Sequence, residues 1–340
     1  MIAFQKNASL KRYNTFGIEA QADFLTKIST EQQLLETLAD DYFSKMPKMV
    51  LGGGSNVLFT KDFAGLVMLM QIGGIEILEE TQESVVIKVG AGVNWHDLVI
   101  FTINKNWGGF ENLSLIPGTV GAAPMQNIGA YGVEIKDTII NVEALALSDN
   151  QKYIFSNAAC KFAYRESIFK NEVKNQFIIT AVIFRLTKNP THFNMGYGDI
   201  QQTLQSMNVA KPSLQTISEA VIQIRRSKLP DPQQFGNAGS FFKNPEILLA
   251  AYQHLKHIYD NIPSYLVSDT KVKVPAAWLI EQSGWKGKTF GNYGVHDKQP
   301  LVLINFGQAK GEEIWNLALQ IQQSVYQKFG IMLSPEVNKI

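Results

Sequence analysis

Apolar residues in the first half of the chain form short runs, separated by segments with helical spacing. The runs are rich in Val, Ile, Leu, Met and Phe and predict strands over residues 48–51, 65–70, 84–89, 141–147 and 177–186. A helix is expected over 95–104, because Asn94 can cap it and Leu98, Val99 and Thr102 share one face. The first half therefore consists of strands alternating with helices.

The second half is predicted to be more helical. Apolar residues recur at spacings of three and four between Leu214 and Ile224, which predicts an amphipathic helix over roughly 213–226. A shorter helix over 278–282, a strand over 301–305 and a last helix ending at Phe329 follow. Gly330 is placed to close that last helix. A domain boundary is expected near residue 222.

Composition and charge narrow the class of protein. The chain has 340 residues, of which 45% are hydrophobic and 18% charged, as in a globular protein of two or three domains. A net charge of +1 argues against a nucleic-acid footprint over the whole surface. Cys160 is the only cysteine, so no intrachain disulfide can form, which fits a reducing compartment. His254 and His257 could share a helical face, but without a third ligand we expect no metal site.

The ends and the apolar runs bear on the expected location. The first residues lack a basic stretch followed by an apolar one, and no apolar run approaches the length needed to cross a bilayer. We therefore expect a cytoplasmic protein without a membrane or nucleic-acid partner.

Three glycine-rich segments are candidates for ligand binding. Residues 52–56 follow a strand, and consecutive glycines can direct amide groups at a phosphate, although no P-loop sequence follows. Residues 90–92 lie where a dinucleotide fingerprint would begin, but Trp95 occupies the position of its third glycine, so they are interpreted as a turn. Residues 117–132 hold four glycines and three alanines, which favours close passage of the backbone along an extended cofactor.

A fourth segment, residues 236–245, combines small residues with candidate chemistry. Its glycines leave the backbone bare beside the hydroxyl of Ser240, and two phenylalanines, a lysine and an asparagine follow. The segment alone is equally consistent with a reaction site and with a glycine-rich turn that enters a buried strand.

Five segments together resemble one enzyme family. They are residues 51–58, 117–132, 164–167, 236–245 and 334–337, in this order. The chain is similar over about residues 13–337 to the UDP-N-acetylenolpyruvoylglucosamine reductases, also called UDP-N-acetylmuramate dehydrogenases. Tyr197, within residues 196–199, resembles the tyrosine that covers the substrate in one of the two types of this enzyme.

The resemblance implies an α+β fold with a two-part FAD-binding domain like that of vanillyl-alcohol oxidase and a smaller α/β substrate-binding domain. The expected boundaries are 1–70, which the C-terminal segment could join, 71–222 and 223–340. FAD is expected to be non-covalent, because no histidine follows the first glycine loop and Cys160 lies outside both flavin loops. The expected FAD contacts are Gly52, Gly53, Gly54, Ser55, Asn56, Val57, Pro117, Gly118, Thr119, Gly121, Ala122, Gln126, Asn127, Gly129 and Ala130.

The family's reaction is the NADPH-dependent reduction of an enolpyruvyl nucleotide sugar in peptidoglycan precursor synthesis. The resemblance implies that flavin N5 passes a hydride to the vinyl carbon, and that Arg165 stabilises the resulting enolate, for which a guanidinium is well suited. Glu336 matches the second polar partner of this intermediate. Ser240 matches the proton donor to the alpha carbon, although a serine hydroxyl is a weak acid.

Further matches imply substrate contacts at Tyr131, Tyr197, Lys228, Asn244, Tyr265, Lys286 and Gln299, and the protein is expected to be a monomer. Two other interpretations stay open. One is an FAD oxidoreductase of the same fold that acts on alcohols or phenols. The other is an inactive protein that binds nucleotide sugars without a flavin.

Overall fold

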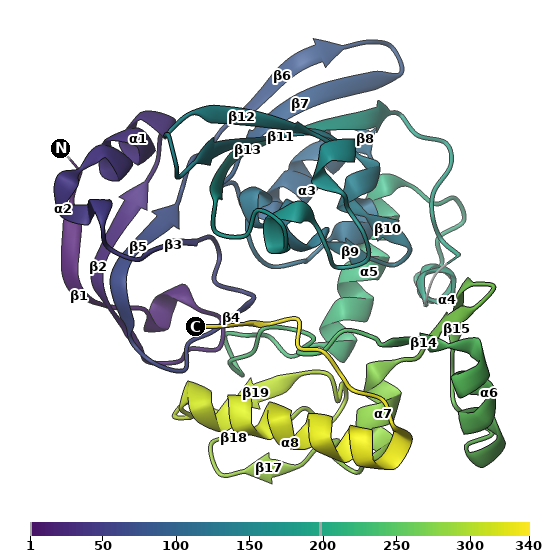
Figure 1. Cartoon of the computed structure of the whole chain (residues 1–340). Helices are drawn as coiled ribbons and strands as arrows, with labels where there is room; N and C mark the ends of the chain where they lie inside the picture. The colour runs from purple at the N-terminus through teal and green to yellow at the C-terminus, as the bar shows by residue number, and fades with distance from the viewer. Residues whose placement is uncertain (1, 197–198) are drawn as a thin grey trace. The chain divides into compact units, whose positions relative to one another are not determined.

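The computed structural model describes residues 2–196 and 199–340 and has an α+β fold (Figure 1). The chain divides into two compact units, each assembled from separate segments. Unit 1 comprises the residues up to Ala8 together with Ala22–Gly53 and Ala64–Ser227. Unit 2 comprises Ser9–Gln21, Gly54–Phe63 and Lys228–Ile340. The finer division at residues 70 and 222 stays a prediction.

The N-terminal part of unit 1 is built on a four-stranded sheet of order β1-β2-β5-β3. Its strands are β1 (Phe4–Ser9), β2 (Gln21–Ile28), β5 (Phe63–Met70) and β3 (Lys48–Leu51). Helices α1 (Glu31–Ala39) and α2 (Asp41–Ser44) accompany it, and the Thr30 side chain caps α1. The parallel pairing of β3 with β5 directs the chain into the first glycine-rich loop.

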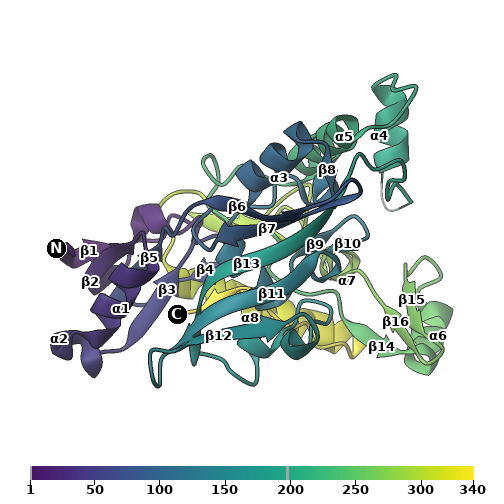
Figure 2. The same cartoon turned by 90° about the horizontal axis from the view of Figure 1, so that it is seen from above.

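The main sheet of unit 1 runs in the order β12-β11-β13-β7-β6, with β8 paired to β13 (Figure 2). The strands are β6 (Ile75–Glu80), β7 (Ser84–Gly90), β8 (Trp107–Gly108), β11 (Ile139–Ala146), β12 (Lys152–Ser156) and β13 (Phe177–Lys188). Helix α3 (Trp95–Asn104) has the bounds that the sequence predicts. Its Trp95 ring is buried and packs edge-on against Phe110, whose ring does the same with Phe184. This aromatic contact joins helix and sheet in one core.

Short elements and two further helices complete unit 1. The strands β9 (Gly129–Ala130) and β10 (Val133–Glu134) form a small hairpin within the third glycine-rich segment. The helices are α4 (Ile200–Ser206) and α5 (Leu214–Lys228), and the apolar face predicted for α5 is buried. Single 3-10 turns over the chain lie at Lys11–Tyr13, Glu111–Leu113, Val120–Ala122, Pro124–Gln126, Ile135–Asp137, Ala158–Cys160 and Ile168–Lys170.

Unit 2 contains small sheets and three helices. The strands are β4 (Val57–Leu58) with β20 (Asn338–Lys339); β14 (Glu246–Leu248), β16 (Lys271–Lys273) and β15 (Tyr265–Ser268); and β17 (Thr289–Phe290), β18 (Tyr293–Val295) and β19 (Leu303–Asn305). The helices are α6 (Leu249–Ile258), α7 (Ala276–Gln282) and α8 (Gly311–Phe329). Gly330 ends α8 at a φ of 67°, as the sequence predicts.

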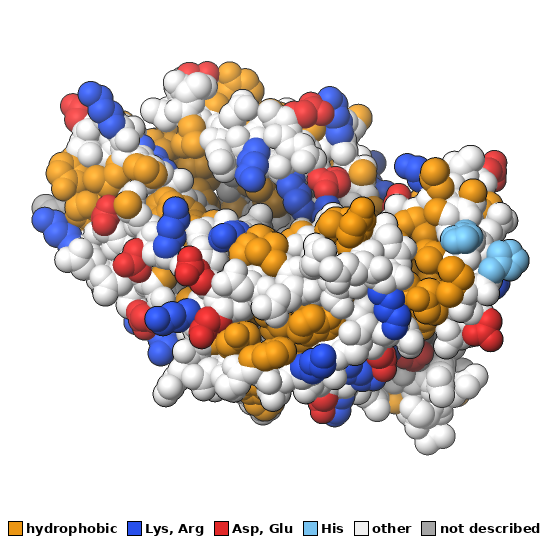
Figure 3. Space-filling view, turned by 60° about the horizontal axis from the view of Figure 1, so that its bottom comes forward, with side chains coloured by type: hydrophobic (Ala, Val, Ile, Leu, Met, Phe, Trp, Pro, Cys, Tyr) orange, Lys and Arg blue, Asp and Glu red, His pale blue; other side chains and the backbone are white. Residues whose placement is uncertain are grey.

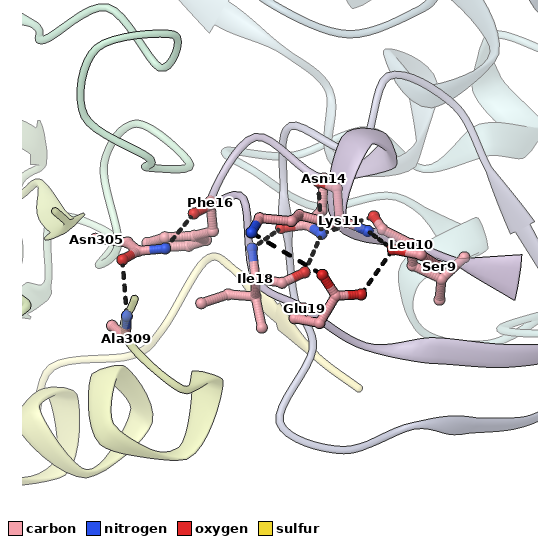
Figure 4. A network of polar contacts seen from close by, with 9 residues as sticks. All are labelled: Ser9, Leu10, Lys11, Asn14, Phe16, Ile18, Glu19, Asn305 and Ala309. Carbon is pink, nitrogen blue, oxygen red and sulfur yellow. Dashed lines mark hydrogen bonds and ion pairs between the residues drawn. The ribbon is translucent and has the colours of Figure 1, made fainter. Parts of the chain in front are cut away.

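Two asparagines fix the segment 9–21 within unit 2 (Figure 4). Asn305 donates to the carbonyl of Phe16 at 2.8 Å and accepts from the amide of Ala309 at 3.0 Å. Asn14 donates to the carbonyls of Leu10 and Ile18, each at 2.9 Å. These bonds satisfy backbone groups of a segment that has little regular structure.

None of the helices within residues 2–196 and 199–340 is long and apolar enough to cross a bilayer. The same residues bring no three His, Cys, Asp or Glu side chains together in a metal-binding arrangement.

Candidate active site

The first and third glycine-rich segments meet in unit 1. A methyl group on Gly53 would lie 2.9 Å from the Cα of Gly118, and one on Gly52 would lie 2.5 Å from Oγ1 of Thr119. Both distances are shorter than real Cβ atoms tolerate, so these backbones approach each other closely because the side chains are absent.

The second glycine-rich segment packs against the same place. The amide of Gly121 donates to the carbonyl of Ala91 at 2.8 Å, and a methyl on Gly121 would lie 2.6 Å from the Ala91 Cβ. The amide of Val120 donates to the carbonyl of Val93 at 2.9 Å. Residues 90–93 are thus more than the isolated turn that the sequence predicts. The small residues Gly121 and Ala91 are the sequence feature that permits this contact. Nothing in the local sequence of either segment indicates that the two segments pair.

Asn127 uses its side chain inside the loop. The residue is fully buried with a φ of 45°, and its amide donates to the Glu134 carboxylate at 2.9 Å and to the Ala163 carbonyl at 3.0 Å. Its Oδ1 accepts from the amide of Lys136 at 3.1 Å. The side chain therefore organises the 117–132 loop from inside, and the residue as a whole is closed to solvent.

Arg165 lies beside the same loop. One of its Nη atoms donates to the carbonyl of Gly129 at 2.8 Å, and its guanidinium lies 5.7 Å from the centre of the Tyr164 ring. Its φ of 57° places it in the left-handed region, which is strained for a long side chain.

Arg225, in the last turn of α5, is a further cation near this site. Burial lowers the pKa of Arg225, the nearby Tyr131 raises it and the charge of Arg165 lowers it again. Tyr131 packs against the apolar cluster that contains Ile224, the residue before Arg225, and Arg165 contacts Gly129 of the same loop, so the three residues share one neighbourhood. The only sequence signal is that Arg225 precedes Lys228 near the end of a predicted helix.

In unit 2, Ser240 and Glu336 both adjoin one buried residue, Phe241. Ser240 is exposed and forms a bridge with Val302. The next residue, Phe241, is fully buried, and its carbonyl accepts the amide of Glu336 at 2.8 Å. Phe242 is also buried and pairs with Pro335. The segment is thus an exposed hydroxyl followed by an apolar wall.

The end of the first glycine loop joins this arrangement. The Asn56 side chain donates to the carbonyl of Glu336 at 3.3 Å, and β4 pairs in parallel with β20. A methyl on Gly54 would overlap the carbonyl oxygen of Tyr13, so this glycine at φ 61° is required for packing. Unit 2 therefore holds Ser240, Glu336 and Asn56, whereas Arg165 and Tyr131 belong to unit 1.

The remaining predicted substrate residues lie on several elements. The Oδ1 of Asn244 accepts from the amide of Ala276 at 2.9 Å, and Lys286 pairs with Glu281 at 2.7 Å. Lys228 ends α5, and Gln299 is half-buried before β19. Tyr197 lies outside the described residues.

Tyr265 lies on an exposed apolar surface of unit 2. Its side chain is 52% exposed, and Figure 3 shows apolar side chains gathered beside histidines on this face. The exposed apolar residues on and around α6 and β15 are Leu248, Ile258, Tyr265, Leu266 and Val267. Tyr265 is therefore accessible to a ligand, as a stacking residue must be.

Comparison with known proteins decides the family. The UDP-N-acetylenolpyruvoylglucosamine reductase of Flavobacterium johnsoniae is 50% identical to this chain over 336 residues, which are 99% of both chains. The chain belongs to the UDP-N-acetylenolpyruvoylglucosamine reductase family. The family member from Amoebophilus asiaticus is also 50% identical and covers 99% of both chains. The family's C-terminal domain matches residues 231–340, and an FAD binding domain matches residues 22–150.

A solved reductase of this family has the same fold. The structure of the enzyme from Thermus caldophilus superposes with a TM-score of 0.67 at 20% identity and covers 100% of this chain and 98% of that one. The predicted family, the α+β fold with an FAD-binding and a substrate-binding part, and the flavin cofactor are confirmed.

The protein is an FAD-dependent oxidoreductase. Gly52, Gly53, Gly118 and Gly121, at which the three glycine-rich segments pack closely together, form a glycine-rich cluster within the region matched by the FAD binding domain, and successive backbone amides of such loops suit the phosphates of this cofactor. The individual FAD contacts stay predictions.

Proposed function

We propose that the protein reduces UDP-N-acetylglucosamine enolpyruvate to UDP-N-acetylmuramate with NADPH, in peptidoglycan precursor synthesis. Full-length identity of 50% to a named reductase supports the substrate. The observation that carries the mechanism is the arrangement of Ser240 and Glu336 around the buried Phe241, in the unit that contains the family's C-terminal domain.

FAD would lie along the glycine-rich cluster and meet residues 52–57 and 117–130. Bound FAD supplies a hydride carrier between NADPH and the enolpyruvyl double bond. Non-covalent binding is consistent with the chemistry of Cys160, because burial raises the pKa of this thiol to about 12. The thiol is therefore protonated at neutral pH and a poor nucleophile.

Arg165 would hold the substrate carboxylate as negative charge develops on it. A guanidinium stays charged and can donate two parallel hydrogen bonds to a carboxylate. Its contact with the Gly129 carbonyl fixes its direction before substrate arrives, and preorganised donors contribute most where charge forms.

Ser240 would donate the proton to the alpha carbon. The Ser240 side chain is exposed and therefore accessible to a substrate, whereas the next two residues, Phe241 and Phe242, are buried and anchor the backbone that carries it. Glu336 would assist either as a neutral acid or by orienting the proton donor, since an ionised carboxylate would repel the enolate.

Other residues would hold the nucleotide sugar. We propose diphosphate contacts from Lys228 and Asn244, of which Asn244 retains its side-chain NH₂ because Ala276 engages only its oxygen. Lys286 would have to exchange its contact with Glu281 for a phosphate or the base. Further proposed contacts are Tyr131, Tyr197, Tyr265 and Gln299.

The proposal also covers location and domain roles. NADPH and nucleotide sugars are cytoplasmic metabolites, so we place the reaction in the cytoplasm, with a monomeric enzyme. Residues 1–70 and 71–222 would serve FAD, and residues 223–340 would serve the substrate.

Ser240→Ala tests the assignment through the two half-reactions. NADPH should still bleach the flavin under anaerobic conditions, whereas recovery of colour with the enolpyruvyl sugar should slow by about 10²–10⁴-fold, the usual contribution of general acid catalysis. Ser206→Ala, an exposed serine on α4, is the matched control and should leave both half-reactions unchanged. Equal loss of both half-reactions would contradict the role of Ser240, and recovery driven only by oxygen would contradict the proposed substrate.

A further inference from the structure

Leu115 has an unusual backbone, two residues before the 117–132 loop. Its φ is 58°, in the left-handed region, where a bulky L-residue is strained. Such a conformation persists only when the surroundings hold it in place. The backbone of Leu115 must therefore be held in this conformation by contacts with other residues of unit 1.

Two side chains hold Leu115 through its backbone. The amide of Leu115 donates to Nδ1 of His96 at 3.0 Å, and its carbonyl accepts from Nε of Arg225 at 3.3 Å. His96 lies in the first turn of α3 and Arg225 in the last turn of α5. Both polar groups of the strained residue thus have partners, one from each helix.

Neighbouring residues are anchored by the same two helices. The indole of Trp95 on α3 donates to the carbonyl of Leu113 at 3.0 Å. The hydroxyls of Ser114 and Ser218, the latter on α5, lie 2.7 Å apart and are buried. Figure 2 shows α3 and α5 on the same side of the main sheet. Residues 113–115 are therefore hydrogen-bonded to both helices immediately before the glycine-rich loop begins. We call this set of hydrogen bonds the clasp.

The contact requires a neutral imidazole. Nδ1 of His96 accepts a hydrogen bond, so it cannot carry a proton. Burial lowers the pKa of His96, Asp97 of the same helix raises it, and Arg226 and Arg225 of α5 lower it. The imidazole is therefore neutral at pH 7, with its proton on Nε2.

Arg225 connects this clasp with the candidate site. Ile224, the residue before Arg225, belongs to the apolar cluster against which Tyr131 of the 117–132 loop packs, and Arg165 contacts Gly129 of that loop. Arg225 thus contacts Leu115, two residues before the loop, and lies near two candidate site residues.

We propose that His96 and Arg225 are positioning residues that hold Leu115 in its left-handed conformation and thereby preset the 117–132 loop for FAD. The inference rests on the proposed assignment of this loop to FAD. Neither residue needs to touch the flavin, because both act through the backbone of Leu115.

The test compares His96→Leu, which removes the acceptor, with His96→Asn, whose Oδ1 can take the place of Nδ1. Removing one such hydrogen bond should raise the FAD dissociation constant by about three- to tenfold. Flavin fluorescence at pH 7 measures this constant. Hydrogen–deuterium exchange of the Leu115 amide, measured in the holoenzymes by mass spectrometry, should quicken in His96→Leu and stay slow in His96→Asn.

A pH series gives a second measurement that needs no disruptive variant. FAD affinity of the wild type should fall in mild acid, as the pH drops through a His96 pKa that lies below its ordinary value of 6.5 and the protonated imidazole loses its acceptor. His96→Asn does not titrate in this range and should show a flatter profile. Parallel profiles for the two proteins would overturn the proposal.

Two controls separate this inference from the loop assignment. Gly121→Val should abolish FAD binding, because Ala91 leaves no space for a side chain; normal FAD binding in this variant would refute the loop assignment itself. His254→Leu, on the exposed face of α6, should leave FAD affinity unchanged. Loss of binding in Gly121→Val with unchanged affinity and exchange in His96→Leu would overturn the clasp alone.

Discussion

Three residues of the candidate site adopt the left-handed conformation without being glycine. Asn127, Tyr131 and Arg165 have φ values of 45°, 50° and 57°. Asparagine tolerates this region, but tyrosine and arginine are strained in it, and such strain concentrates at functional sites. The sequence shows which residues could serve the site, but it does not show their backbone φ angles. It could therefore not reveal that the amide of Asn127 turns inward while Arg165 is held against Gly129.

Glu143 is a carboxylate of the main sheet that is paired with two lysines. It is nearly buried on β11 and lies 2.8 Å from the ammonium of Lys88 and 3.0 Å from that of Lys152, which also contacts Glu31 at 3.0 Å. Burial raises the pKa of Glu143, but the hydrogen bonds and charges of the two lysines outweigh it and bring the pKa below its ordinary value of 4.5.

Glu143→Gln should lower the free energy of unfolding by roughly 1–3 kcal/mol at pH 7, because Lys88 and Lys152 both lose the Glu143 carboxylate and Lys152 keeps only Glu31. A carboxyl whose pKa is lowered by folding stabilises the fold above its unfolded pKa, and this stabilisation disappears as the pH falls through the folded value. The difference between variant and wild type should therefore narrow below pH 4.5. Urea denaturation at pH 7 and in mild acid measures it.

The matched control is Glu172→Gln. Glu172 pairs with Lys161 at 2.8 Å, but both side chains are more than half exposed. Exposed pairs contribute little, so this variant should change stability by less than about 0.5 kcal/mol. An equal effect of both substitutions would show that burial does not strengthen the Glu143 contacts.

At the scale of elements, α8 begins with a glycine that contradicts its helix propensity. Gly311 is the first residue of the helix, and a methyl there would overlap the carbonyl oxygen of Phe59. Glycine to alanine usually stabilises a helix by up to about 1 kcal/mol. Gly311→Ala should instead destabilise the protein by about 1–3 kcal/mol, because the backbone at Phe59 must move. Thermal unfolding of Gly311→Ala shows whether the substitution stabilises or destabilises the protein. The control is Gln320→Ala, at an exposed position of the same helix.

Elements with a strong local pattern could be predicted from the sequence. The period of α5 and the cap of α3 indicate their positions within a few residues, and the apolar runs locate β3, β7 and β13. The strand expected at residue 301 begins at Leu303, since element ends have weaker signals than their centres. The packing of residues 90–93 on the 117–123 segment could not be predicted, because it depends on a backbone contact between segments that show only turn chemistry.

At the scale of the molecule, the family resemblance predicts consecutive domains, with the C-terminal segment able to join the N-terminal part. In the structure each compact unit is discontinuous, and the first glycine loop itself is divided between Gly53 and Gly54. The five family motifs identified the site without showing this division. Pairings between residues nearly 300 positions apart leave no periodicity that a single sequence can display.

The pairing of β20 with β4 is one of these long-range contacts and yields the last prediction. Asn338 donates from its backbone and side chain to the carbonyl of Asn56, at 3.1 and 3.0 Å. Thr60 donates from its amide and hydroxyl to Ile340, each at 2.8 Å. Removing residues 338–340 should therefore lower the free energy of unfolding by about 2–4 kcal/mol, at about 1 kcal/mol for each lost hydrogen bond. Urea denaturation of the full chain and the truncated chain measures this.

The same truncation should also weaken FAD binding, since Asn56 ends the first glycine loop and would lose the partner strand that aligns it. The control is a chain in which residues 338–340 are all alanine. It keeps the backbone bonds of β20 and loses only the side-chain contacts, so it should retain most of the stability and the FAD affinity. If the alanine chain and the truncated chain are equally impaired, the side chains rather than the strand pairing connect the C-terminal segment to the flavin loop.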